Sequence, residues 1–322
     1  MTEQIKGKKF IVTGGAGFIG SHLSEHLLEN GASKVIVIDN LLTGFVKNIE
    51  HLSSYPAFEF AETDINDRNT IASYFEGADV VFHEAALGSV PRSVKNPVDT
   101  NLHNGHGFVN IAFLAKEAGV KKLVFASSSS VYGDDTHQPK IEIHTGKALS
   151  PYAISKKTNE MYAELFAELY EMDITGLRYF NVFGPRQNPE GPYAAVIPIF
   201  IDKILKGENV PIYGTGEQSR DFTYVKNVVN ANILAAFTPN TEKPYRIINI
   251  ANGGLTSVNE LFENLKKHIG GISEALYLDA RKGDIFTSTA NIDKAKNILN
   301  YQAEYSLQEG LEETVAWYKN QL

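Results

Sequence analysis

The chain of 322 residues contains no cysteine and no long hydrophobic run. The absence of cysteine excludes disulfides and thiol chemistry. A membrane-spanning helix needs about eighteen consecutive apolar residues, and because none occur here we expect no membrane partner. The opening residues MTEQIKGKKF lead into an apolar strand pattern without the core of a signal peptide, so the cytoplasm is the expected location.

Basic runs and clusters of metal ligands are scarce as well. The net charge is −8, and the lysines are scattered, so nucleic acid is not an expected partner. His22 and His26 stand at helical spacing, as do His103 and His106, but no third ligand accompanies either pair. We therefore interpret these histidines as packed side chains and predict no metal site.

The first informative pattern is a strand, a glycine-rich turn and a helix that follow one another without a gap. Residues 8–14 read KKFIVTG, the turn reads TGGAGFIG, and residues 18–31 carry leucines at helical spacing. Gly14 suits the conformation of the turn, Gly17 leaves room for a pyrophosphate, and Gly20 lets the helix pack closely on the strand. The pattern predicts a dinucleotide site that also includes Phe18 and Ile19.

An acidic residue after the second predicted strand supports this interpretation. Asp39 ends the strand KVIVID about twenty positions after the turn, where a carboxylate binds an adenosine ribose and repels a 2′-phosphate. NAD is therefore favoured over NADP, the alternative being that Asp39 only caps a loop. Further cofactor contacts are expected in the following loop and at other strand ends, namely at Asn40, Gly44, Asp64, Ile65, Ala85, Ala86 and Tyr179. For Asp64, Ile65, Ala85 and Ala86 the alternative is a plain loop without a role in binding.

A serine, a tyrosine and a lysine form the expected catalytic group. Tyr152 and Lys156 lie at helical spacing in SPYAISKKTNE, and Ser128 lies where the apolar strand KKLVFA runs into a serine cluster. A free tyrosine loses its proton near pH ~10, so Tyr152 needs the positive charges of Lys156 and oxidised nicotinamide to act as a base. Ser128 would hydrogen-bond the reacting hydroxyl. Each motif alone occurs by chance, but together they predict a nicotinamide-dependent enzyme.

Four segments carry a family resemblance. TGGAGFIG, the serine cluster before VYG, YAISK and RYFNVFGPRQ resemble the extended short-chain dehydrogenase/reductase family. Within its nucleotide-sugar branch, SVPRS and SSSSVYGD are similar to the UDP-hexose 4-epimerases that handle UDP-N-acetylglucosamine and its uronic acid. The resemblance, which runs nearly end to end, implies an α/β fold with a Rossmann-type doubly wound parallel sheet and a smaller C-terminal substrate-binding α/β region.

Two domains are implied, although the chain length alone is equally compatible with one large α/β unit. The implied NAD-binding domain comprises residues 1–181 and roughly 222–250, and the UDP-sugar-binding domain comprises residues 182–221 and 251–322. The predicted helices at 103–119 and 152–171 both carry apolar stripes. By the resemblance these stripes pair with a second copy in a homodimer, and the alternative is that they face the sheet.

The resemblance also implies a mechanism. Tyr152 would remove the proton of the sugar 4-hydroxyl while the C4 hydride passes to NAD, and the resulting 4-keto sugar would turn over and take the hydride back on its opposite face. NAD would then be regenerated in each cycle and stay bound.

The UDP-sugar would meet a separate set of residues. Ser288 stands where the family gates the 2-substituent, and its small side chain implies an N-acetylhexosamine. Arg92 would either meet a C6 carboxylate or brace its loop, and Val196 could equally have a packing role. The implied substrate-binding residues are Gly88, Ser89, Arg92, Ser129, Asn181, Gln187, Ala195, Val196, the diphosphate-binding pair Arg220 and Arg281, and Ser288.

Two alternatives compete with C4 epimerisation of UDP-N-acetylglucosamine and UDP-N-acetylgalactosamine. Related dehydratases and decarboxylases carry an acidic residue just before V-Y-G, where this chain has three serines, Ser128 to Ser130. A non-catalytic nucleotide-sugar-binding protein would have no need of Ser128, Tyr152 and Lys156 together. The leading interpretation is therefore the epimerase, with UDP-glucose/UDP-galactose and the uronic acid forms left open as further substrates.

Overall fold

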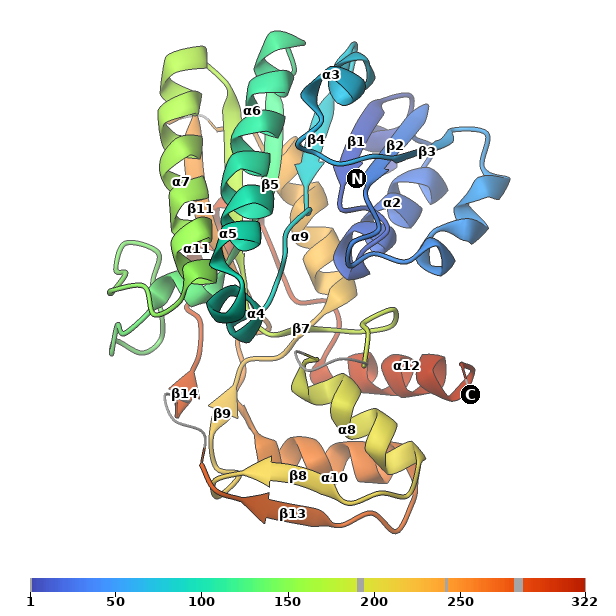
Figure 1. Cartoon of the computed structure of the whole chain (residues 1–322), viewed down its shortest axis with the longest axis vertical. Helices are drawn as coiled ribbons and strands as arrows, with labels where there is room; N and C mark the ends of the chain where they lie inside the picture. Colours follow the sequence, from blue (N-terminus) through green and yellow to red (C-terminus); the bar gives the residue numbers. More distant parts are fainter. Residues whose placement is uncertain (1, 190–193, 241–242, 281–285, 322) are drawn as a thin grey trace.

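The centre of the computed structural model is a parallel sheet of seven strands (Figure 1). The structure describes residues 2–189, 194–240, 243–280 and 286–321. The strands are β1 (Lys9–Thr13), β2 (Lys34–Asp39), β3 (Phe58–Glu62), β4 (Val80–His83), β5 (Lys122–Ser128), β6 (Asp173–Tyr179) and β11 (Tyr245–Ile250). Their spatial order, β11-β6-β5-β4-β1-β2-β3, reverses between β1 and β4, which is the switch point at which doubly wound sheets bind ligands.

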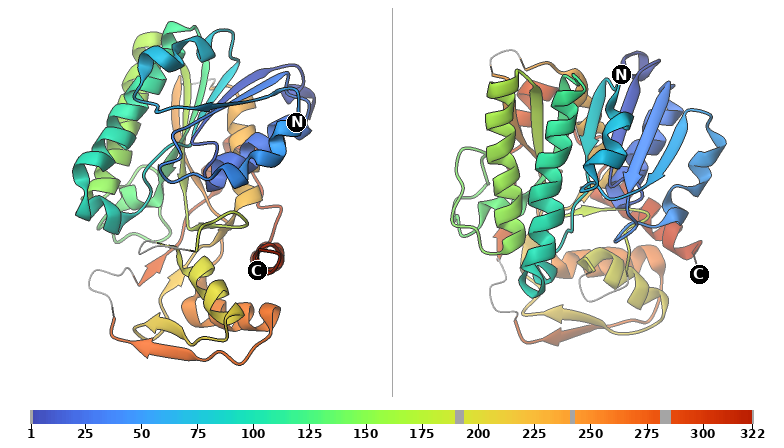
Figure 2. Two further views of the ribbon diagram at one scale, coloured as in Figure 1. Left: turned by 45° about the vertical axis from the view of Figure 1, so that its right-hand side comes forward. Right: turned by 45° about the horizontal axis from the view of Figure 1, so that its top comes forward.

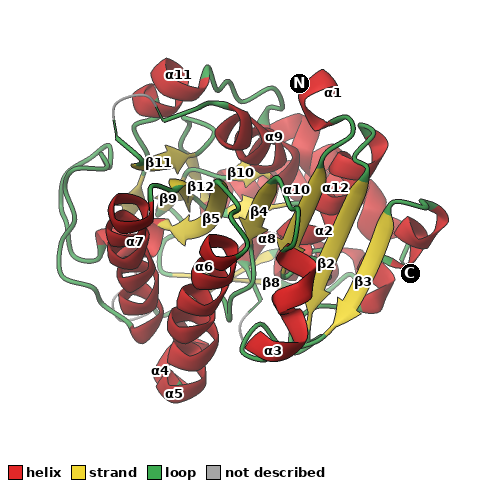
Figure 3. Cartoon of the chain, turned by 90° about the horizontal axis from the view of Figure 1, so that it is seen from above, coloured by secondary structure: helices red, strands yellow, loops and turns green. Residues whose placement is uncertain are grey.

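Helices cover both faces of the sheet because its strands are apolar on both sides. Along β1, Phe10 and Val12 point to one face and Ile11 to the other. Figure 3 shows α6 and α7 on one side of the sheet and α9 and α11 on the other. The first layer contains α3 (Arg68–Ile71), α6 (Gly107–Glu117) and α7 (Pro151–Tyr170), and the second contains α2 (Phe18–Glu29), α9 (Val225–Phe237) and α11 (Asp293–Leu299).

A smaller region lies beside the carboxyl end of β6 and has its own apolar core (Figures 1 and 2). Phe200, Leu261 and Leu311 bring its three helices together in that core. The helices are α8 (Val196–Leu205), α10 (Val258–Ile269) and α12 (Leu307–Lys319). The strands are β7 (Val182–Phe183) with β10 (Thr223–Tyr224), β8 (Val210–Tyr213) with β13 (Ala275–Leu278), and β9 (Ser219–Arg220) between β12 (Thr256–Ser257) and β14 (Thr287–Ser288).

Short helical turns connect these elements. They are α1 (Thr2–Ile5), α4 (Val90–Lys95), α5 (Pro97–Thr100), the π-helical turn Asn101–His106, and 3-10 turns at Val46–Asn48, Glu50–Ser54, Ala72–Phe75 and Ser129–Tyr132. Across the described ranges, none of the helices combines the length and apolarity that crossing a bilayer requires.

The Rossmann-type α/β fold predicted from the sequence is confirmed. One local expectation differs from the structure. Glycine, proline and asparagine in NVFGPRQNPEGPYAAVIP, residues 181–198, predict a long loop leaving the sheet, but β7 pairs with β10 just after the chain leaves β6. This pairing depends on residues some forty positions further on, which a local pattern does not reveal.

Candidate active site

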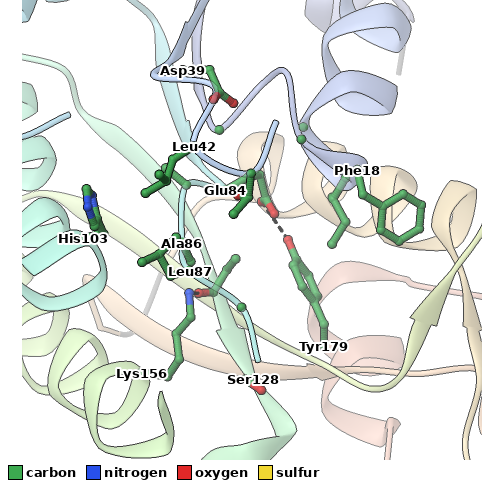
Figure 4. Close-up of a pocket in the computed structure, with 18 of the residues that line it drawn as sticks. Phe18, Asp39, Leu42, Glu84, Ala86, Leu87, His103, Ser128, Lys156 and Tyr179 are labelled. Atoms are coloured by element: carbon green, nitrogen blue, oxygen red, sulfur yellow. Dashed lines mark hydrogen bonds between the residues drawn. The ribbon is translucent and has the colours of Figure 1, made fainter. Parts of the chain in front are cut away.

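A cavity of about 440 Å³ opens at the carboxyl ends of β1, β2, β4, β5 and β6 (Figure 4). It gathers residues that the sequence assigned to both the cofactor and the chemistry. The predicted residues that line it are Gly14, Gly17, Phe18, Ile19, Gly20, Asp39, Asn40, Ile65, Ala85, Ala86, Gly88, Arg92, Ser128, Tyr152, Lys156, Tyr179 and Asn181.

The glycine-rich turn is shaped by steric limits at two positions. Gly14 has φ +67°, and a Cβ there would lie 2.6 Å from the backbone nitrogen of Ala85. A Cβ on Gly20 would meet the carbonyl oxygen of Gly14. These two glycines therefore let β1, the turn and α2 approach one another, with Gly17 as the residue that caps α2.

Asp39 is buried at the end of β2 and is held by the turn. Its carboxylate accepts hydrogen bonds from the backbone N–H groups of Ala16, at 3.0 Å, and Leu41, at 2.8 Å. Burial raises the pKa of this carboxyl, and the two hydrogen bonds oppose that shift. Gly44 does not line the cavity; a Cβ there would lie 2.9 Å from Asp39 Oδ1, so Gly44 makes room for the carboxylate.

A network of polar side chains surrounds Asp64, at one end of the predicted cofactor site. Asn40 Nδ2 donates to Asp64 Oδ2 at 2.7 Å, so Asp64, which does not itself line the cavity, positions a residue that does. His103 Nδ1 lies 3.8 Å from Asp64 Oδ2, and this histidine, interpreted from the sequence as packed, lines the cavity. His22 packs against the loop after β7, where it contacts the carbonyl oxygen of Pro185 at 3.0 Å.

The predicted catalytic group is assembled from β5 and the first turns of α7. Ser128 is the last residue of β5. Pro151 begins α7 and the Ser150 hydroxyl caps it, accepting from Ala153 N at 3.1 Å, which places Tyr152 in the first turn and Lys156 one turn later. The predicted helical spacing of Tyr152 and Lys156 is therefore confirmed.

Lys156 is buried, and its ammonium group donates to the carbonyl oxygen of Ala126 at 2.7 Å. Burial lowers the pKa of Lys156 to about 8, against the opposing charges of Glu84 and Glu160. Burial in the cavity raises the pKa of Tyr152. A hydrogen bond with Ser128 opposes this shift, and the charge of Glu84 reinforces it. The sequence predicted that Lys156 would lower this pKa; in the structure its ammonium donates to Ala126 and lies 6.0 Å from the centre of the Tyr152 ring.

The loop after β4 contributes residues that the sequence assigned to the sugar. Gly88 and Arg92 line it. Ser89 does not, but its hydroxyl accepts from Arg92 N at 3.2 Å and so begins α4. Asn181 lines the cavity and donates from Nδ2 to the carbonyl oxygen of Asp221 at 2.9 Å.

Other predicted substrate residues lie outside the cavity lining. Ser288 on β14 is the register partner of Arg220 on β9, so two residues far apart in the sequence stand side by side. Arg281 lies outside the described residues. Ser129 follows the lining residue Ser128. Gln187 lies in the loop after β7, and Ala195 and Val196 stand at the start of α8.

Sequence reasoning missed several lining residues. Glu84 had a usable signal, since it precedes the predicted contacts Ala85 and Ala86 at a strand end. The others are Ile38, Leu42, Thr43, Leu87, His103, Ala126, Ser127 and Val182. No group of three potential metal ligands occurs within the described residues.

A doubly wound sheet, a glycine turn fitted to its helix and a buried acid at the end of β2 together define a dinucleotide-binding enzyme of the short-chain dehydrogenase/reductase type. The model of the NAD dependent epimerase/dehydratase family matches residues 10–251. The chain belongs to this family, and NAD is its cofactor.

Similar proteins span the whole chain. A putative UDP-glucose 4-epimerase of Methanocaldococcus jannaschii is 43% identical over 312 residues, covering 96% of this chain and 98% of the relative. The structure of the UDP-N-acetylglucosamine 4-epimerase from Methanobrevibacter ruminantium, in complex with UDP-N-acetylmuramic acid, has a TM-score of 0.93 and 40% identity, and the match covers 98% and 100% of the two chains. The Thermus thermophilus UDP-glucose 4-epimerase complexed with NAD has a TM-score of 0.87 and 32% identity, with 98% and 100% covered.

Proposed function

We propose that this chain is an NAD-dependent UDP-sugar 4-epimerase that interconverts UDP-N-acetylglucosamine and UDP-N-acetylgalactosamine. The observation that carries the proposal is that Ser128, Tyr152 and Lys156 line one cavity together with the glycine turn and Asp39. Membership of the epimerase/dehydratase family and relatives that are UDP-sugar 4-epimerases support the activity.

Each catalytic side chain has a separate task in this proposal. Bound NAD supplies the acceptor and donor of a hydride at C4 of the sugar. Tyr152 accepts the proton of the 4-hydroxyl and returns it after the 4-keto sugar has turned over, so protons and electrons balance over one cycle. Ser128 hydrogen-bonds the reacting oxygen, and the ammonium of Lys156 stabilises the negative charge that develops on Tyr152.

The segment after β5 favours epimerisation over elimination or decarboxylation. It consists of Ser128, which ends β5, and of Ser129 and Ser130, which begin a 3-10 turn. The Ser128 hydroxyl caps this turn by accepting a hydrogen bond from Ser130 N at 3.1 Å. By the family resemblance, dehydratases and decarboxylases carry an acidic residue in this segment, where it assists elimination or positions the sugar acid. Hydroxyl groups suffice when a carbinol is oxidised and reduced again.

The preference for an N-acetylated sugar rests on Ser288. This residue is half-buried on β14, beside Arg220, to which we assign the substrate diphosphate because a guanidinium suits the geometry of a phosphate. A small side chain at this position leaves space for a 2-acetamido group. The similarity to the Methanobrevibacter ruminantium UDP-N-acetylglucosamine 4-epimerase supports the same preference.

A uronic acid is the second candidate substrate, and the position of Arg92 in the cavity lining favours it. The residue lines the cavity next to Gly88, where its guanidinium would bind a C6 carboxylate.

Parallel incubations with UDP-N-acetylglucosamine, UDP-glucose and UDP-N-acetylglucuronate, followed by proton NMR of the C4 isomers, rank the three sugars. The proposal expects the N-acetylhexosamine to react fastest. Fastest turnover of UDP-glucose would contradict the assignment of Ser288, and fastest turnover of the uronate would make Arg92 the determinant of specificity. The variant Arg92→Met then serves as a matched test, because it removes the charge and keeps an unbranched, flexible side chain at this position.

A further inference from the structure

Glu84 is an acidic side chain inside the catalytic cavity that the proposed chemistry does not use. It follows β4 and lines the same cavity as Ser128, Tyr152 and Lys156. Figure 4 shows it between the glycine turn and Tyr179, with its carboxylate directed at the Tyr179 hydroxyl. Among the described lining residues, Asp39 is the other acid, and that carboxylate is held by backbone N–H groups at the end of β2.

A directional chain of hydrogen bonds fixes this carboxylate. Asn232 on α9 donates from Nδ2 to the carbonyl oxygen of Val228, at 3.0 Å, and to the Tyr179 hydroxyl oxygen, at 2.8 Å. Because a carbonyl only accepts, this contact defines the orientation of the amide, and Tyr179 must then send its own proton elsewhere. It donates to Glu84 Oε1 at 2.8 Å. This chain of hydrogen bonds thus holds the Glu84 carboxylate in place as an acceptor.

The charges around Glu84 are coupled. Enclosure in the cavity raises the pKa of Glu84 to about 7, while the Tyr179 hydrogen bond and the charge of Lys156 oppose that shift. Ionised Glu84 in turn raises the pKa values of Lys156 and Tyr152, the charged or titratable groups of α7 that it faces.

We propose that Glu84 is a positioning residue whose carboxylate, held by Tyr179, is the counter-charge in the catalytic cavity to the Lys156 ammonium and to the cationic, oxidised nicotinamide. The inference rests on the roles proposed above for Tyr152 and Lys156. An enzyme that must return its hydride in every cycle benefits from a resting site that prefers oxidised cofactor, since a ketone that escapes leaves an inactive, reduced protein.

The variant Glu84→Gln separates charge from hydrogen bonding. The amide oxygen still accepts from Tyr179, so a purely structural role predicts little change. Loss of the charge is expected to weaken the preference for oxidised over reduced bound cofactor about tenfold, the factor that corresponds to one pKa unit. In a redox titration of the holoenzyme, this is a rise of about 30 mV in the midpoint potential of the bound cofactor.

The pH profile of turnover supplies a second readout. Removing the negative charge of Glu84 lowers the pKa of Lys156, so the fall in turnover that follows loss of the Lys156 proton is expected to move to lower pH. Glu76→Gln makes the same chemical change at an exposed position before β4 and is expected to leave both readouts unchanged. Tyr179→Phe removes the donor that stabilises ionised Glu84, which raises the pKa of Glu84 and leaves less of it charged at neutral pH, so both readouts are expected to shift in the same direction by a smaller amount.

An unchanged potential together with an unmoved pH profile in Glu84→Gln would overturn the proposal. If that variant fails to fold, Tyr179→Phe decides in the same way. The redox titration needs no turnover, so it tests Glu84 even if Tyr152→Phe retains activity and the proposed chemistry fails.

Discussion

At the scale of single residues, Tyr152 is the side chain on which the proposed chemistry depends most. It is held in the first turn of α7 and shares the cavity with Ser128 and Lys156. Tyr152→Phe is expected to lower turnover by at least about 100-fold, the range lost when an acid–base group is removed, and to leave NAD bound. Turnover and cofactor content of the purified variant are the measurements.

Tyr162→Phe is the matched control, because Tyr162 lies on the exposed side of the same helix. We expect it to behave as the parent enzyme. Substantial residual turnover in Tyr152→Phe would refute the assigned base.

Lys156 gives a prediction on pH. Burial lowers its pKa to about 8, so the ammonium is present below that pH and is lost as the pH rises through it. Because the charged form stabilises the developing phenolate, turnover is expected to fall above about pH 8 with cofactor still bound. A rate that stays constant to pH ~10 would show that the charge of Lys156 does not support catalysis.

Ser288 tests the substrate preference. Ser288→Tyr is expected to abolish turnover of UDP-N-acetylglucosamine by filling the space for the acetamido group, and to spare UDP-glucose. Thr289→Ser, a small change at the next position, is the control. Should Ser288→Tyr leave turnover of both sugars intact, the gate does not lie at this residue.

At the scale of secondary-structure elements, the glycine turn makes a steric prediction. A Cβ on Gly20 would meet the carbonyl oxygen of Gly14, whereas a Cβ on Gly254 would meet nothing within 4 Å. Gly20→Ala is therefore expected to reduce the NAD retained through purification, and Gly254→Ala is expected to retain as much as the parent. Equal retention in both variants would show that the fit of α2 against the turn does not control cofactor binding.

The same elements show which parts of the site could be predicted from the sequence. The glycine turn, Asp39, and the pair Tyr152 and Lys156 are local patterns, and the structure confirms the strand, turn and helix that hold them. Glu84 and Tyr179 are 95 positions apart and meet only because β4 and β6 end at the same edge of the sheet. Contacts of this kind depend on strand order, which no local pattern contains.

At the scale of the whole molecule, a homodimer remains a proposal. The outer surface formed by α5, the π-helical turn and α7 supports it. Large apolar side chains are exposed there, including Val98 at 74%, Met161 at 66% and Leu169 at 61%. Clustered apolar side chains on a surface mark protein–protein contacts, and α7 packs on the π-helical turn to form one continuous face. We propose that this face binds a second copy of the chain.

Leu165→Glu places a charge in this face and is expected to convert the dimer to a monomer, as measured by light scattering coupled to size-exclusion chromatography. Glu263→Lys changes charge at an exposed position of α10, in the smaller region away from this face, and serves as the control. A parent protein that is monomeric at all concentrations would contradict the proposed dimer. The domain boundaries and the cytoplasmic location stay predictions from the sequence.

The central claim is that the C4 hydride leaves the sugar and returns to it within one cycle on a retained cofactor. UDP-N-acetylglucosamine deuterated at C4, incubated without added NAD and followed by NMR, tests this claim most directly. The account predicts that UDP-N-acetylgalactosamine forms and that the deuterium stays at C4 in both sugars. Loss of deuterium to solvent, its transfer to another carbon, or no reaction even after NAD is added would contradict it.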